Sequence, residues 1–157
     1  MKKQKLMMTV GALAALALFA VTASAADSDP RFGRWKNKSG APAPQSNIMT
    51  YEPYHGSGMK ITINSVNKDG KASEWGYTTM FDGKDEALVG NPGTDTGSVK
   101  ILNDKVNEIV YKKGGRVTQV LTNVLSADGK TLGILYMRYN AEGHCTNVSA
   151  ATYEKIE

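Results

Sequence analysis

Apolar and polar side chains alternate with a period of two along most of the chain after residue 30. Met59, Ile61 and Ile63 fall on one face of such a segment, opposite polar side chains, and residues 74–81 repeat the pattern with aromatic side chains. This period is that of a β-strand, in which successive side chains point to opposite faces. No window after the first 25 residues keeps apolar side chains at helical spacing for more than two turns, so we expect an all-β protein.

Turn-forming dipeptides separate these alternating segments at short intervals. Asp-Gly occurs at 69–70, 82–83 and 128–129, and Gly-Gly at 114–115. Such dipeptides tolerate the positive φ angles of tight hairpin turns, and the runs between them are rich in Val, Ile, Thr and aromatic residues, as strands prefer. The predicted strands are residues 31–37, 47–55, 58–68, 71–82, 86–89, 97–103, 105–113, 115–127, 130–141 and 144–156.

Strands joined in sequence by tight turns predict an antiparallel up-and-down meander. A flat sheet of this length would leave two exposed edges, so closure into a barrel of about 8–10 strands is the expected outcome. Apolar side chains on both faces of 116–126 predict a strand that is covered on both sides. The polar segment 36–46, which contains Pro42 and Pro44, predicts an extended connection rather than a helix.

The N-terminus has a different character. Lys2, Lys3 and Lys5 precede an apolar run at residues 6–21, and Ala23-Ser24-Ala25 follows that run. A positive start, a short apolar stretch and small residues before the cleavage point are the three parts of a secretory signal peptide. The run is shorter than the roughly 20 residues needed to cross a bilayer. We therefore expect cleavage after Ala25 and a periplasmic or secreted protein.

The expected organisation is a cleaved signal peptide at 1–25, a short tail at 26–30 and one barrel domain at 31–157. Removal of the signal peptide lowers the formal net charge from +4 to +1, because that segment contains three lysines and no acidic residue. A nearly neutral domain lacks the basic surface of nucleic-acid-binding proteins. We expect no nucleic-acid partner and no membrane span after cleavage.

The first predicted strand contains Gly33-Arg34-Trp35, which resembles the Gly-x-Trp signature of lipocalins and related calycins. The chain is also similar, over roughly residues 31–156, to small secreted bacterial proteins of lipocalin-like type that share several short motifs in the same order. The matching residues are Gly33 to Lys36, Tyr51 to Pro53, Phe81 to Asp85, Gly90 to Pro92 and Tyr153 to Lys155.

The resemblance implies a lipocalin-like barrel whose tryptophan, here Trp35, closes one end. In that family a basic side chain from late in the chain lies across the indole, and the candidates here are Arg138 and Lys155. A cation over an aromatic face contributes roughly 0.5–2 kcal/mol.

Residues with catalytic or metal-binding chemistry are few. His55 and His144 both lie beside turn glycines, and adjacent side chains on a strand diverge, so His144 is poorly placed to activate Cys145. The single cysteine cannot form an intramolecular disulfide, and we expect it to be at least partly buried. The acidic residues Asp82, Asp85, Glu86 and Asp95 are expected to make turn hydrogen bonds rather than a cation site or an acid/base pair. We therefore expect no enzyme, no metal and no cofactor.

Aromatic side chains are the most informative candidates for function. Buried tyrosines need hydrogen-bond partners, so several of them facing the interior suit a ligand with both apolar and polar parts. The predicted ligand-binding residues are Tyr51, Trp75, Tyr77, Phe81 and Tyr136. An interior void of about 300 Å³ or more would favour this hypothesis.

Two functions remain open from the sequence. The first is an exported lipocalin-like protein that binds a small apolar or amphiphilic molecule in or at the mouth of the barrel. The second is an interaction module of the cell envelope, with a solid barrel and an envelope protein as its partner. The first predicts an internal cavity, and the second an exposed apolar patch.

Overall fold

The computed structural model describes residues 29–157, which form ten β-strands in one sheet. The predicted signal peptide and most of the predicted tail lie outside these residues. All ten predicted strands are present, with their ends shifted by a few residues. They are β1 (Gly33–Asn37), β2 (Ser46–Tyr54), β3 (Gly58–Val66), β4 (Ala72–Thr79), β5 (Glu86–Ala87), β6 (Thr96–Ile101), β7 (Val106–Lys113), β8 (Arg116–Leu125), β9 (Thr131–Tyr139) and β10 (Cys145–Lys155).

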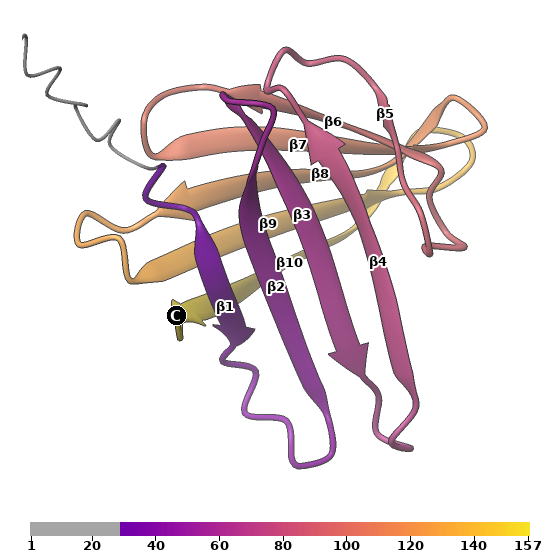
Figure 1. The fold of residues 1–157 in the computed structure, drawn as a ribbon. Coiled ribbons are helices and arrows are strands. Elements are labelled where there is room, and N and C mark those ends of the chain that lie inside the picture. Colours follow the sequence, from indigo (N-terminus) through magenta and orange to yellow (C-terminus); the bar gives the residue numbers. More distant parts are fainter. Residues whose placement is uncertain (1–28) are drawn as a thin grey trace, which may run out of the picture.

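The strands form an antiparallel meander that closes on itself, which confirms the predicted barrel. Their order in the sheet is β4-β3-β2-β1-β10-β9-β8-β7-β6-β5, so the first and last strands of the chain are neighbours. Figure 1 shows two walls: β1 to β4 run steeply across the front, and β6 to β10 run behind them in another direction. The space between these walls is the interior of the barrel.

The second closure, between β4 and the segment after β5, is much looser. Gly76 and Val89 exchange two backbone hydrogen bonds of 3.0 Å, and this isolated bridge connects the two sheet edges. A Cβ atom on Gly76 would collide with the backbone oxygen of Ile61 in β3. Glycine at position 76 therefore lets β4 lie this close to β3. With the bridge between Gly76 and Val89, the barrel is nearly closed.

Four residues in contact with one another close one end of the barrel, which we call the closed end. They are Trp35, Arg31, Phe81 and Asn107. Trp35 is fully buried, and its Nε1 donates a hydrogen bond of 2.8 Å to the backbone oxygen of Arg31. The Arg31 guanidinium lies 5.5 Å from the Phe81 ring centroid and donates to Asn107 Oδ1 at 3.4 Å. These contacts tie the N-terminal segment to three other parts of the barrel.

The basic side chain expected across the tryptophan is Lys155. Its Nζ lies 5.5 Å from the centroid of the Trp35 ring and donates to the backbone oxygen of Pro30 at 3.0 Å. The strand register explains the choice, because Trp35 in β1 is paired directly with Lys155 in β10. Arg138, the other candidate, lies toward the opposite end of β9 from the buried Leu132.

The structure also explains why the first residue of the Gly-x-Trp motif, Gly33, is a glycine. Its φ of 128° is one that side chains rarely adopt, and a Cβ atom there would collide with the backbone oxygen of Glu157. The C-terminal residues pass close to this point, where Arg34 N donates to the Glu157 backbone oxygen at 2.9 Å. Glycine thus permits the contact between the two ends of the barrel sequence.

Two expectations about burial are wrong. The segment 116–126 is not covered on both faces, because Val124 on the outer face is 47% exposed while Leu121 and Leu125 point inward and are buried. Cys145 is exposed rather than buried. The pairing of β9 with β10 shifts between Cys145 and Asn147, and residues 141–150 are exposed throughout.

The connection between β1 and β2 contains no helix, as predicted from its prolines. Within residues 29–157 no helix is long and apolar enough to span a bilayer.

Replacement of the closed-end tryptophan tests this description of the fold. Trp35→Ala should lower the free energy of unfolding by about 3–5 kcal/mol, because it leaves a cavity in place of a large, fully buried side chain. Urea denaturation measures this loss, with Trp75→Ala as the matched control. Trp75 is only partly buried and should cost less than half as much. A loss below roughly 1 kcal/mol for Trp35→Ala would contradict its placement.

Candidate functional site

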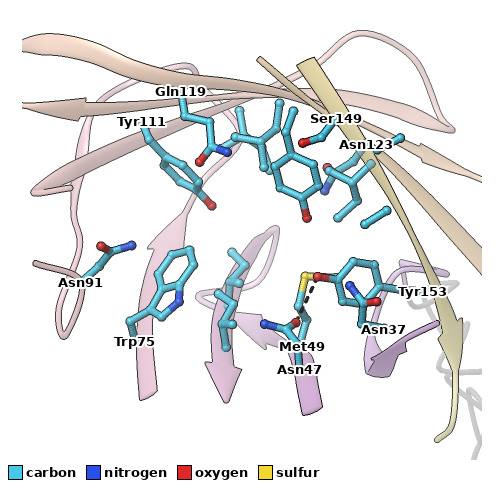
Figure 2. A pocket seen from close by; sticks show the side chains of 18 of the residues that line it. Asn37, Asn47, Met49, Trp75, Asn91, Tyr111, Gln119, Asn123, Ser149 and Tyr153 are labelled. Atoms are coloured by element: carbon cyan, nitrogen blue, oxygen red, sulfur yellow. Dashed lines mark hydrogen bonds between the residues drawn. The ribbon is translucent and has the colours of Figure 1, made fainter. Parts of the chain in front are cut away.

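The interior of the barrel holds a cavity of about 430 Å³. It lies between the wall of β1 to β4 and the wall of β7 to β10 (Figure 2), and none of the four closed-end residues lines it. Trp75, Met49 and Asn47 come from one wall, and Tyr111, Gln119 and Asn123 face them from the other. The barrel is therefore not solid.

Aromatic side chains form one side of the cavity. Trp75 and Tyr77 alternate along β4 and point to the same face, where their rings stack with centroids 6.4 Å apart. The Tyr111 ring of β7 stands edge-on to both rings, with each centroid distance 5.8 Å. These three rings form an apolar aromatic side of the cavity.

The hydroxyls of this aromatic group are linked by a single hydrogen bond. Tyr111 donates its hydroxyl to the Tyr77 hydroxyl at 3.2 Å, and both side chains are buried. On the other side of the cavity, the Tyr153 hydroxyl donates to Asn47 Oδ1 at 3.0 Å, and Asn47 Nδ2 donates to Ser65 at 2.7 Å. The cavity therefore has hydrogen-bonding groups on both sides of its apolar surface.

Side-chain amides provide most of the remaining polar lining. Asn37, Asn47, Asn91, Gln119 and Asn123 all border the cavity. Asn123 is 3% exposed, and its Oδ1 has no hydrogen-bond partner among residues 29–157. An unpaired buried polar atom is costly, so this interior is not built for stability alone.

Formal charges are nearly absent from the cavity. Arg138 is the one charged residue among those that line it, and this side chain is exposed at the open end. Arg31 lies at the closed end, where its Nε is 2.9 Å from Asp29 Oδ1. Of the two cations at the closed end, Arg31 is thus already paired with Asp29, and Lys155 lies over the Trp35 ring and donates to the Pro30 backbone oxygen.

Burial strongly disfavours ionisation of the cavity tyrosines. It raises the pKa of Tyr77 to about 12, although the hydrogen bond from Tyr111 opposes the shift. Burial also raises the pKa values of Tyr51, Tyr111 and Tyr136 well above the usual range, and the negative charges that neighbouring phenolates would carry add to each shift. All four side chains are neutral phenols at physiological pH.

The structure brings four of the five predicted ligand-binding residues together. Tyr51, Trp75, Tyr77 and Tyr136 line the cavity, whereas Phe81 does not. Strand β4 ends at Thr79, and Phe81 has a φ of 60° with its backbone N–H bonded to Thr79 Oγ1 at 2.9 Å. This turn directs Phe81 to Arg31 at the closed end instead.

The amides, Tyr111 and Tyr153 were not among the ligand-binding residues predicted from the sequence. Their signal is the same alternation: Asn47, Met49 and Tyr51 share one face of β2, and Gln119, Leu121 and Asn123 share one face of β8. Polar residues at inward positions were not recognised, because alternation alone does not say which face is inside.

Three acidic residues near the predicted turns bond to backbone N–H groups or pair with lysines. Asp82 accepts a turn hydrogen bond of 3.1 Å from the Lys84 backbone, as expected. Asp85 instead pairs with Lys112, and Asp95 accepts a bond of 2.9 Å from the Gly114 backbone, so both contact segments far away in the sequence rather than their own turn. Residues 29–157 contain no group of three or more His, Cys, Asp or Glu side chains placed to hold a metal ion.

No protein-family model and no curated protein matches the chain. Among solved structures, the chain is similar to the crystal structure of a mutant of the fluorescent protein UnaG, with a TM-score of 0.53 and 12% sequence identity. The match covers 80% of this chain and 95% of that chain. At this identity the likeness concerns the fold, and together with the meander it makes this an all-β, calycin-like barrel.

Alkaline titration tests the burial of the four cavity tyrosines. Their pKa values are raised in the folded state, so above about pH 10 the folded state retains protons that the unfolded state loses. Their contribution to stability should be complete below about pH 10 and fall toward pH 12, by up to about 1.4 kcal/mol per pH unit for each tyrosine. Urea unfolding from pH 8 to 12 measures it. Ionisation of these phenols while the strand circular dichroism stays unchanged would contradict their burial.

Proposed function

We propose that the protein binds a small amphiphilic molecule inside the barrel. The observation that supports this most directly is a cavity of about 430 Å³ with aromatic rings on one side and amides and phenols around it. Ligand pockets have volumes of about 300–1,000 Å³ and combine an apolar lining with a few placed polar groups. A barrel that served only as a scaffold would be more stable with this space filled.

An interaction role has one observation in its favour. Val124, Leu135 and Val148 lie on the outer face of β8, β9 and β10 and are 47%, 41% and 61% exposed. Scattered apolar residues are common on surfaces, so the cavity supports ligand binding more strongly. Cross-linking in the cell envelope would favour the second function if it captured one partner through this face in a protein that holds no ligand.

Ligand binding can be tested on protein purified from its own host. Native mass spectrometry should detect a co-purified small molecule, and the uncharged dye Nile red should bind the emptied protein. Trp75→Leu should weaken Nile red binding by about two- to tenfold, because it removes aromatic contact from the cavity. Phe81→Leu, outside the cavity, is the matched control and should leave affinity within about twofold.

The proposal fails if no small molecule co-purifies and Nile red does not bind. Equal effects of the Trp75 and Phe81 substitutions on Nile red affinity would place binding outside the cavity.

We also propose that the protein is exported and that its function is exercised outside the cytoplasm. The observation behind this is the sequence of residues 1–25, with its lysines, apolar run and Ala-Ser-Ala end. Intact-mass measurement of the protein from its host should give a chain that begins at Ala26. Ala25→Pro should block processing and leave the longer chain, whereas a mature protein that still begins at Met1 would contradict the proposal.

A further inference from the structure

The cavity contains a buried hydroxyl proton that makes no hydrogen bond among residues 29–157. Tyr77 and Tyr111 each have one O–H donor, and a single bond of 3.2 Å joins the two hydroxyls. That bond uses one of the two protons. Among residues 29–157 no hydrogen bond accounts for the other, although both side chains are only 6% exposed.

Two of the other tyrosine hydroxyls in the cavity have partners within the barrel, whereas the hydroxyl of the partly buried Tyr136 makes no hydrogen bond of ordinary length among residues 29–157. Tyr153 donates to Asn47 Oδ1 at 3.0 Å, and the Tyr51 hydroxyl lies 3.6 Å from the sulfur of Met49. The free proton of the Tyr77–Tyr111 pair is therefore the most deeply buried uncommitted hydroxyl donor of the cavity, since both side chains are 6% exposed and Tyr136 is only partly buried. Figure 2 shows the Tyr111 hydroxyl directed into the space between the two walls, near Trp75. Because this hydroxyl donates to the Tyr77 hydroxyl, the free proton is the one on Tyr77.

The charge distribution further restricts the ligand. Among residues 29–157 no carboxylate lines the cavity, so these residues offer a cationic ligand no counter-charge there. An anionic group deep in the cavity would lie among buried neutral phenols, with Arg31 already paired to Asp29 and Arg138 at the exposed end. A buried charge without a partner is unfavourable, and the interior favours neutral polar groups.

We propose that the ligand is an uncharged, flat aromatic molecule with a carbonyl-type oxygen that accepts a hydrogen bond from the Tyr77–Tyr111 pair. This assignment rests on the proposed function and specifies its ligand class. The Trp75 and Tyr77 rings, stacked with an interplanar angle of 12°, provide the flat apolar surface, and the hydroxyl pair lies next to it. Pairing the free donor supplies the specificity, because a ligand without an acceptor leaves the donor unpaired.

Two nearly isosteric probes separate the hydrogen bond from hydrophobic contact. Both 2-acetylnaphthalene and 2-ethylnaphthalene are uncharged, and only the first has a carbonyl oxygen. The ratio of their affinities should change by about tenfold, against the ketone, in the double variant Tyr77→Phe with Tyr111→Phe. Each single variant keeps one free hydroxyl and should retain most of the preference. Tyr153→Phe is the matched control, because its hydroxyl already donates to Asn47.

Two further measurements accompany the affinities. The infrared carbonyl stretch of bound 2-acetylnaphthalene should move to lower frequency in the unmodified protein, and this shift should disappear in the double variant. The anion 2-naphthoate should bind at least about tenfold more weakly than the ketone at pH 7. Near-ultraviolet circular dichroism of every variant checks that the barrel is folded.

Each outcome has a definite consequence. An affinity ratio that is unchanged in the double variant, an unshifted carbonyl stretch, or 2-naphthoate binding as tightly as the ketone would overturn this assignment. So would Nile red binding without binding of either uncharged naphthalene, and in all these cases the proposed function would stand. The absence of a co-purified molecule together with no binding of Nile red, which contradicts the proposed function, would overturn both if the naphthalenes also fail to bind.

Discussion

The pairing of β1 with β10 is the constraint on which the rest of the structure depends. It joins the first and last strands of the described barrel and brings Trp35 directly opposite Lys155. On its other side β1 pairs with β2, where Trp35 is opposite Met49. Without β1 the meander would be an open sheet with two long edges, and neither the closed end nor the cavity would exist.

Stability and binding are assigned to different parts of this barrel. Trp35, Leu132 and Val99 are the most deeply buried large side chains, and they form an ordinary apolar core. Away from the closed end, inward positions of the barrel strands are occupied by tyrosines and amides that line the cavity. A cavity with an unpaired Asn123 oxygen lowers stability, and this cost is understandable if the space is kept for a ligand.

The strand positions could be predicted because two local signals agree, namely period-two alternation and glycine-containing turns. The site was harder to predict because it depends on where each strand stops and which face is inside. Phe81 continues the alternation of Trp75 and Tyr77 in the sequence, but β4 ends at Thr79 and the chain turns away. Asn123 is a typical surface residue by type, and only the closed register shows that it is buried. Export remains a prediction from residues 1–25.

The cavity between Trp75 and Asn123 is, on this view, a ligand site rather than a loosely packed core. A crystal structure of the protein isolated from its own host, without removal of bound molecules, tests this most directly. We expect continuous density for a flat, non-solvent molecule beside Trp75, with an oxygen within hydrogen-bonding distance of the Tyr77 or Tyr111 hydroxyl. A barrel in which Tyr77, Tyr111 and Tyr136 close together and fill the space would contradict it.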